Sequence, residues 1–169
     1  MIDYVILVDK DDNPIGREEK LKAHELGLLH RAFSIFIWNT KGELLLQKRS
    51  LSKYHSAGLW TNTCCSHPRP SEDIMEAAHR RLQEEMGFDC ELKKAFHFTY
   101  TAKLDAGLTE NEFDHVLVGT HDTDPIINPD EADEFKWASM EWIKEDMTTH
   151  PDDYTVWFKI CFEEVLKHT

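Results

Sequence analysis

The most regular pattern of apolar and polar residues lies between Ser71 and Gly87. Ile74, Ala78 and Leu82 recur every four residues, which places them on one face of a helix. Ser71 is a favourable N-cap, and Gly87 suits the position just after a final helical turn. The pattern predicts an amphipathic helix that begins at Ser71 and ends just before Gly87.

Shorter apolar runs that are bounded by turn residues predict strands in the rest of the chain. The expected strands span residues 4–8, 31–38, 44–49, 60–65, 92–101, 112–119 and 135–140. The third of them should pair back on the second as a hairpin. Further helices are expected at 17–26, 142–147 and 153–167. Strands and helices are mixed without regular alternation, which predicts an α+β domain with a mixed sheet.

The composition suits one domain that spans residues 1–169. Hydrophobic residues make up 41% of the chain, which is enough for a single core. No apolar run approaches the roughly 20 residues that a membrane span needs, and no basic segment precedes an apolar one at the N-terminus. We therefore expect a cytoplasmic protein. We also expect a monomer, because no strong apolar helix face is left over.

The charge balance narrows the class of partner. A net charge of −13 disfavours nucleic acid, since phosphate backbones bind basic surfaces. A small anionic substrate would need a metal ion or a local cluster of Lys and Arg. The four cysteines form no CxxC pair, and Cys64 and Cys65 would point to opposite faces of a strand. Free thiols are therefore expected.

Two pairs of residues with acid, base or metal-binding side chains share the spacing of one strand face. Cys65 and His67 lie two positions apart, as do Glu110 and Glu112. In extended segments both members of each pair would point to the same side. Such pairs also occur in ordinary packing, where Cys65 would be a small buried hydrophobe. Convergent strands could assemble the two pairs into one site.

The predicted helix also has Arg80 four residues before Glu84, and Arg81 four residues before Glu85. Spacing alone describes surface ion pairs worth a few tenths of a kcal/mol each. The segment nevertheless resembles the Nudix box, with matching residues at Glu72, Arg80, Leu82, Glu84, Glu85, Gly87 and Phe88. Two positions depart from it: Ser66 replaces the opening glycine, and Arg81 replaces a metal-binding glutamate. The second departure weakens a hydrolase interpretation.

The combined motifs, Trp-Thr-Asn-x-x-Cys-x-His-Pro and Glu-Asn-Glu, resemble the type 1 isopentenyl-diphosphate isomerases over nearly the whole chain. The resemblance implies a Nudix-like mixed β-sheet packed with helices, an α/β/α sandwich. It implies isomerisation of isopentenyl diphosphate to dimethylallyl diphosphate through a tertiary carbocation, in isoprenoid biosynthesis. The substrate would be a small molecule, and no nucleic acid or membrane partner is expected.

The resemblance also implies roles for particular residues. The implied metal ligands are His24, His30, His67, Glu110 and Glu112, a donor set that suits zinc, manganese or magnesium. Glu85 would hold a magnesium ion that bridges the diphosphate. Proton transfer is assigned to Cys65 and Glu112, with a hydrogen bond from Tyr100 and the π-face of Trp157 over the cation. By spacing alone, Trp157 is better explained as helix packing. The diphosphate would be bound by Lys20, Arg49, Lys53 and Arg81.

Two other functions remain open at this point. A Nudix hydrolase of nucleoside diphosphate derivatives would leave Cys65, Glu110 and Glu112 without a role. A non-catalytic metal-binding or interaction module would take up metal without turnover and would tolerate Cys65→Ala. The acidic, proline-containing segment 122–134 has no assigned function in any of these interpretations.

Overall fold

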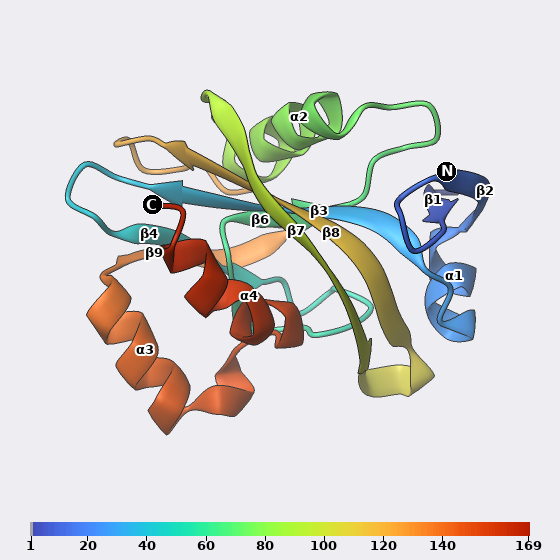
Figure 1. The fold of residues 1–169 in the computed structure, drawn as a ribbon. Coiled ribbons are helices and arrows are strands. Elements are labelled where there is room, and N and C mark those ends of the chain that lie inside the picture. Colours follow the sequence, from blue (N-terminus) through green and yellow to red (C-terminus); the bar gives the residue numbers. More distant parts are fainter. Residues whose placement is uncertain (1) are drawn as a thin grey trace.

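Strand β3 (His30–Trp38) lies at the centre of a nine-stranded mixed sheet in the computed structural model, which describes residues 2–169 (Figure 1). It runs parallel to β8 (Thr109–Thr120) and antiparallel to β6 (Cys64–Ser66). Nearly every residue of β3 is buried, because protein covers both faces of the sheet. An uninterrupted apolar run of this kind is typical of a strand that is covered on both sides.

The other elements surround this central strand. The N-terminal part contains β1 (Tyr4–Val8), β2 (Pro14–Glu19) and helix α1 (Lys20–Leu26). The middle of the chain contains β4 (Leu44–Arg49), β5 (Trp60–Thr61), α2 (Ile74–Met86) and β7 (Leu92–Lys103). The C-terminal part contains β9 (Ala132–Ala138), α3 (Met140–Thr149) and α4 (Val156–Leu166).

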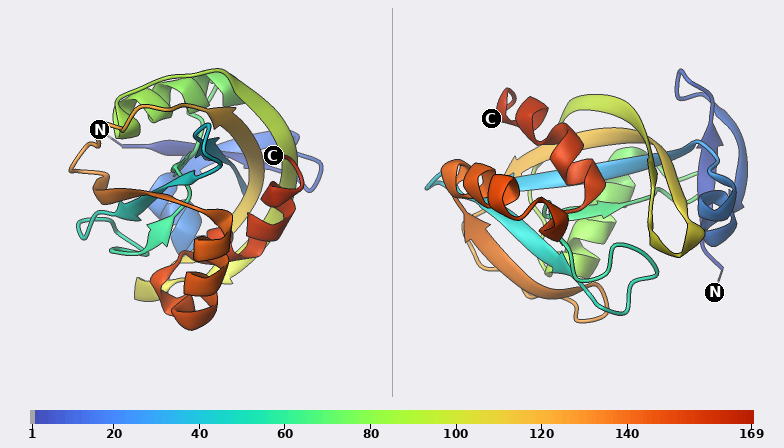
Figure 2. Two further views of the ribbon diagram at one scale, coloured as in Figure 1. Left: turned by 90° about the vertical axis from the view of Figure 1, so that its left-hand side faces the viewer. Right: turned by 90° about the horizontal axis from the view of Figure 1, so that it is seen from below.

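Helices cover the sheet from two sides, which confirms the expected α/β/α sandwich (Figures 1 and 2). Alternate residues of β3 face alternate layers. Phe33, Ile35 and Ile37 pack in the cluster that contains α2, whereas Phe36 packs with Phe158 of α4. The ring centroids of Phe36 and Phe158 are 5.9 Å apart. These two apolar layers fix β3, and thereby the strands that flank it.

The N-terminal helix begins later than predicted. A helix was expected over residues 17–26, but Arg17 to Glu19 belong to β2, which pairs antiparallel with β1. Only Lys20–Leu26 is helical, and Gly27 ends it in the left-handed conformation, at φ 66°. The prediction was wrong because pairing with β1 outweighed the helical propensity of this segment.

Helix α2 confirms the predicted apolar stripe but not its predicted cap. Ser71 has φ 70° and belongs to a turn, and the N-cap is Asp73. The Asp73 carboxylate accepts a hydrogen bond from Met75 N at 3.0 Å, and Glu76 completes a capping box. The helix ends before Gly87 as predicted, at φ 72°. A Cβ at Gly87 would lie 2.7 Å from the carbonyl oxygen of Ile126, so the loop after β8 also requires glycine there.

Two predictions about strands are confirmed only in part. The predicted hairpin of β3 and β4 is present but short, because the two strands pair antiparallel only at Trp38 and Leu44. Strand β4 pairs with β9 along its full length. The segment 60–65 is not one strand but two short ones, β5 and β6, separated by Asn62 and Thr63. The buried side chains of Asn62 and Thr63 form hydrogen bonds with backbone groups of the neighbouring strands β3 and β4, so this break is a rigid connection.

Two expectations drawn from composition can be compared with the structure. All four cysteines are free, as predicted. Among residues 2–169, none of the helices combines the length and the apolar character that crossing a membrane requires.

Candidate active site

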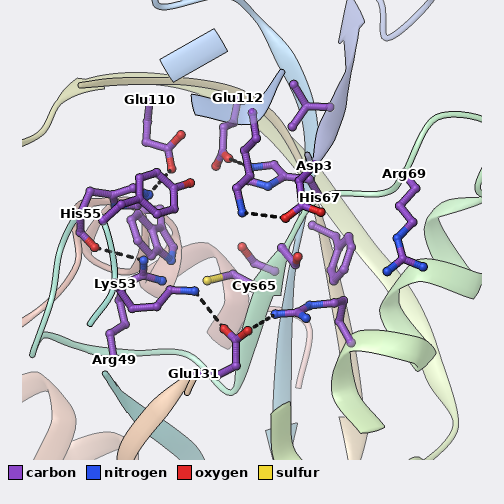
Figure 3. A pocket seen from close by; sticks show the side chains of 18 of the residues that line it. Asp3, Arg49, Lys53, His55, Cys65, His67, Arg69, Glu110, Glu112 and Glu131 are labelled. Carbon is purple, nitrogen blue, oxygen red and sulfur yellow. Dashed lines mark hydrogen bonds and ion pairs between the residues drawn. The ribbon is translucent and has the colours of Figure 1, made fainter. Parts of the chain in front are cut away.

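Cys65 and Glu112 reach one cavity because their strands flank the same strand, β3. Cys65 lies opposite Ser34 in the β3–β6 pair, and Glu112 lies opposite His30 in the β3–β8 pair. Both side chains line the cavity, with Glu112 at its upper side and the Cys65 sulfur lower down in Figure 3. His67 and Glu110 line it as well. The same-face spacing seen in the sequence thus becomes a shared site.

Five side chains bring potential metal ligands together at one side of this cavity. Their ligand atoms all lie within 4.8 Å of one another, and they come from His24, His30, His67, Glu110 and Glu112. His24 belongs to α1, His30 to β3, and the two glutamates to β8. Four of these five residues are buried, and His67 is partly buried. Three imidazoles and two carboxylates form a donor set suited to a divalent cation of higher coordination number.

The hydrogen bonds of two imidazoles orient this cluster. The Nδ1 atoms of His24 and His30 lie 2.7 Å and 2.8 Å from the carbonyl oxygens of Lys20 and Leu28. A carbonyl oxygen only accepts, so each Nδ1 must carry the hydrogen. In the neutral rings the Nε2 lone pairs are then directed into the cluster, as in histidines that bind metal.

One close pair in the cluster shows why a cation fits there. His24 Nε2 lies 2.6 Å from Glu110 Oε1, yet neither buried atom has a hydrogen-bond partner within residues 2–169. Two acceptors at this distance repel each other unless a proton or a cation lies close to both. The residues present therefore fit a divalent metal ion.

Charge and burial act together on the other ligands. Burial lowers the pKa of His67 to about 3, which favours the neutral imidazole that binds metal. Burial and the neighbouring Glu112 raise the pKa of Glu110. For Glu112, burial alone would raise the pKa, but hydrogen bonds with His30 and His67 outweigh it and lower the pKa well below its ordinary value. The cluster thus provides a neutral imidazole at His67 beside the Glu112 carboxylate, whereas at His30 the interaction with Glu112 outweighs burial and raises the pKa.

Glu112 also connects the candidate metal-binding cluster to the side of the cavity where Cys65 lies. Its Oε2 lies 2.7 Å from His67 Nε2, and its Oε1 accepts a hydrogen bond of 2.5 Å from the Tyr100 hydroxyl. Tyr100 is buried, and burial together with Glu112 raises its pKa well above the ordinary value. Burial also raises the pKa of the Cys65 thiol, so that the thiol retains its proton at neutral pH. Two groups able to exchange protons therefore face one cavity.

Trp157 lines the same cavity from helix α4. Its Nε1 lies 3.3 Å from Asn62 Oδ1, and the Arg49 guanidinium lies 5.3 Å from the ring centroid. The ring already has one cation over its π-system and can stabilise positive charge without reacting with it. Helix packing and a role in the site are compatible here, because Trp157 is buried in the α4 cluster and borders the cavity.

Cys64 and Glu85 lie on the other side of β6. The Cys64 thiol donates to Glu85 Oε2 at 2.7 Å, and both residues are buried. The opposite orientations of Cys64 and Cys65 are those expected for neighbours in a strand. Glu85 lies outside the five-residue cluster and next to Arg81, at 3.5 Å from its guanidinium. The structure thus separates Glu85 from the other predicted metal ligands.

The basic residues predicted to bind the substrate all line the cavity, as do two further arginines. They are Lys20, Arg49, Lys53, Arg69, Arg80 and Arg81. Several are paired with acids: Lys20 with Asp3 at 3.6 Å, and Lys53 and Arg81 with Glu131 at 2.9 Å and 3.1 Å. This is the local basic cluster that a small anion requires in a chain of net charge −13.

Sequence reasoning missed several residues that line the cavity, among them Tyr54, His55, Arg69 and Glu131. His55 is buried, with its ring 5.9 Å from that of Trp157 and its Nε2 3.8 Å from Glu110 Oε2. Tyr54 lies under the Lys20 ammonium, 5.2 Å from the ring centroid. These residues belong to loops without a periodic pattern, so no sequence signal marked them.

A family model and the sequences of known proteins both match most of this chain. A family model described as NUDIX domain matches residues 28–158. The protein named isopentenyl-diphosphate Delta-isomerase 2 of Aromatoleum aromaticum is 53% identical, over 98% of this chain and 88% of its own length. The protein of the same name from Photorhabdus laumondii is 56% identical, over 94% of this chain and 90% of its own.

Solved structures resemble the fold. DR0079 from Deinococcus radiodurans matches with a TM-score of 0.73 at 19% identity, over 88% of this chain and 90% of its own. A MutT protein from Methanosarcina mazei matches with a TM-score of 0.67 at 23% identity, over 80% of this chain and 91% of its own. At these identities the likeness concerns the fold alone.

Proposed function

The chain belongs to the NUDIX family and, within it, to the type 1 isopentenyl-diphosphate isomerases, and from this premise we propose how its site works. The enzyme isomerises isopentenyl diphosphate to dimethylallyl diphosphate in isoprenoid biosynthesis. Its substrate is a small isoprenyl diphosphate. The reaction adds a proton to one carbon of an unactivated alkene and removes a proton from another, through a tertiary carbocation.

Cys65 and Glu112 make the two proton transfers in this proposal. Both border the cavity, and both can hold or release a proton there. Whichever of the two donates to the alkene, the other accepts the proton that leaves, so the substrate gains and loses one proton. The Tyr100 hydroxyl holds the Glu112 carboxylate in place through its hydrogen bond of 2.5 Å. General acid–base groups of this kind contribute about 10²- to 10⁴-fold to a rate.

Trp157 stabilises the cation between the two transfers. An indole face attracts positive charge but is a poor nucleophile, so the carbocation is not trapped. The Arg49 guanidinium, 5.3 Å from the centroid of the same ring, supports this role. Arg49 belongs to the basic cluster, so the diphosphate would lie beside this ring.

The His/Glu cluster would hold a divalent metal ion, and we propose manganese, zinc or magnesium. His24, His30, His67, Glu110 and Glu112 would bind it, and a bound cation would hold the charge and proton affinity of Glu112 within a useful range. We further propose that Glu85 binds a magnesium ion that accompanies the substrate diphosphate. Lys20, Arg49, Lys53 and Arg81 would bind the phosphate oxygens directly.

The observation on which the proposal rests is the convergence of three kinds of group on one cavity. A thiol, a metal-ligand cluster that includes Glu112, and six basic side chains all border it. A hydrolase of nucleoside diphosphates would leave the thiol without a function. A cytoplasmic location and a monomeric state remain predictions from the sequence.

Cys65→Ala tests the catalytic assignment. The thiol acts only in proton transfer, so we expect kcat to fall at least about 100-fold while substrate affinity changes less than about twofold. Turnover of isopentenyl diphosphate and equilibrium binding of the same substrate should be measured on one preparation. Cys90→Ser is the matched control, since Cys90 is a partly buried thiol that does not line the cavity. Equal losses in rate and binding would remove Cys65 from the proton-transfer step.

A further inference from the structure

Three of the four basic residues proposed to bind the diphosphate are already paired with carboxylates of the same cavity. Asp3 lies 3.6 Å from the Lys20 ammonium. Glu131 lies 2.9 Å from the Lys53 ammonium and 3.1 Å from the Arg81 guanidinium. Glu131 therefore pairs with both Lys53 and Arg81, and it uses a different carboxylate oxygen for each.

Figure 3 shows Glu131 beside Lys53, with its carboxylate directed into the cavity. Oε2 faces Lys53 and Oε1 faces Arg81. Two oxygens of a phosphoryl group would be shared between the same two cations in the same way. The carboxylate thus has the geometry of the anion for which the site is built.

The backbone around Glu131 holds this arrangement in place. Ser50 directly follows Arg49, the last residue of β4, and its backbone N–H donates to the carbonyl oxygen of Glu131 at 3.0 Å. Glu131 N donates to Asn128 O at 2.9 Å, and Ala132 begins β9. The Glu131 side chain is only 19% exposed, as is that of Lys53. The contact is therefore part of the ordered wall of the cavity.

The charges explain why a carboxylate is useful at this point in the substrate-free enzyme. Burial is the largest cause of the lowered pKa of Lys20, and Lys53 and Arg81 lower it further, as expected for like charges that lie close together. When no anionic ligand is bound, Glu131 offsets the charge of Lys53 and contributes to offsetting Arg81, which also pairs with Glu84 at 2.7 Å and Glu85 at 3.5 Å. Arg49, in contrast, forms no ion pair with a carboxylate within residues 2–169, so its charge remains available to the substrate.

We propose that Glu131 is an internal occupant of the diphosphate site, and that the substrate displaces it from Lys53 and Arg81 on binding. A diphosphate carries more negative charge than a carboxylate and can also reach Lys20 and Arg49, so it outcompetes Glu131. The return of Glu131 weakens the hold on the product diphosphate and favours its release. Glu131 therefore sets the affinity for the diphosphate, and this inference rests on the proposed diphosphate site.

Glu131→Gln tests the displacement, with inorganic pyrophosphate as the probe and the magnesium concentration held fixed. Removing the competing charge should tighten pyrophosphate binding at least about threefold in isothermal titration calorimetry. The KM for isopentenyl diphosphate should fall by a similar factor, without an equal rise in kcat. Glu134→Gln removes the same charge three residues away, where Glu134 pairs with Lys48 outside the cavity. It should leave pyrophosphate binding within about 1.5-fold of the wild type.

The opposite result is equally clear. If Glu131→Gln leaves pyrophosphate binding unchanged or weakens it, Glu131 supports Lys53 and Arg81 instead of competing for them, and the inference fails. Thermal unfolding would show whether the variant is folded. If it is not, Glu131→Asp keeps the charge but shortens its reach, and it too should tighten binding.

Failure of the inference can be separated from failure of the diphosphate site. Lys53→Ala should weaken pyrophosphate binding if Lys53 belongs to that site. A wild-type enzyme that binds no pyrophosphate, or a Lys53→Ala variant that binds it normally, would contradict the site itself. Weakened binding in Lys53→Ala without tightening in Glu131→Gln would contradict only the role of Glu131.

Discussion

Neighbouring residues of the same type have different surroundings in this protein, and this difference decides their chemistry. Cys64 points into the layer of α2 and donates to the buried Glu85, whereas Cys65 points into the cavity. Burial raises the pKa of both thiols. Of the two, only Cys65 lines the cavity, and we therefore propose Cys65 and not Cys64 for proton exchange with the alkene.

At the same scale, Trp157 offers a test of cation stabilisation. We expect kcat to fall in the order Trp, Phe, Leu at position 157, because phenylalanine retains a weaker π-face and leucine retains none. The loss for Trp157→Leu should reach at least about tenfold. Steady-state rates at saturating substrate give the order, and thermal unfolding reports the effect of the smaller side chain on the core.

A matched tryptophan outside the cavity serves as the control. Trp142 is 39% exposed and has the Lys136 ammonium 4.3 Å from its ring centroid. Trp142→Leu should therefore leave kcat within about twofold of the wild type, since it removes an indole without touching the site. If leucine at position 157 were as active as tryptophan, the ring would serve packing alone.

Elements that are far apart in the sequence supply the proposed metal ligands, so this cluster depends on how the elements are assembled. His24 comes from α1, His30 begins β3 and Glu110 belongs to β8. Removing His24 should weaken divalent metal binding at least about tenfold, because one ligand and its orienting bond to Lys20 O are lost. Thermal unfolding after chelation and addition of manganese, zinc or magnesium measures this.

The wild type should gain stability on addition of the metal, whereas His24→Ala should gain less at the same concentration. His79→Ala is the control, since His79 pairs with Asp89 on the outside of α2 at 2.6 Å. An equal gain in wild type and His24→Ala would show that the cluster does not bind the added ion.

The start of α2 provides a prediction about pH. Arg80 donates to both carboxylate oxygens of Glu72 at 2.8 Å, and this hydrogen bonding lowers the pKa of Glu72 below 4.5. The pair therefore stabilises the fold above the ordinary pKa of glutamate, and the contribution is lost as the pH falls through the lowered value. At pH 7, Glu72→Gln should reduce the free energy of unfolding by about 0.5 to 1 kcal/mol, allowing for solvent screening.

Urea unfolding across the acidic range measures this difference. The gap between wild type and Glu72→Gln should close as the pH falls below 4.5. Glu134→Gln should show a smaller gap at pH 7, because Glu134 is 59% exposed and 3.7 Å from Lys48. A gap at position 72 that is independent of pH would mean that packing, not charge, is responsible.

The elements also show how far the sequence could predict the structure. The stripe of Ile74, Ala78 and Leu82 located α2, because a helical period survives whatever surrounds it. The cap at Asp73 could not be read in the same way, since the positive φ of Ser71 comes from a turn. Strand alternation likewise brought Cys65 to the cavity side, but nothing in the local pattern of residues 122–134 indicated that Glu131 would reach Lys53.

At the scale of the whole molecule, the site reverses the charge of the chain around it. The net charge is −13, yet six basic side chains line one cavity, and β3, β6 and β8 place the thiol and the metal ligands beside them. A cavity of this kind can concentrate a diphosphate against the overall field. The fold hosts several chemistries in other proteins, so the residues of this cavity, and not the fold, determine the reaction.

Proton nuclear magnetic resonance of isopentenyl diphosphate in deuterated water, with the enzyme and magnesium present, tests the central claim most directly. We predict loss of the exo-methylene signals, growth of the dimethylallyl signals, and deuterium in the new methyl group, since the added proton comes from an exchangeable group of the enzyme. An unchanged substrate spectrum, with bound metal confirmed on the same sample, would contradict the assignment of Cys65 and Glu112 as proton-transfer groups.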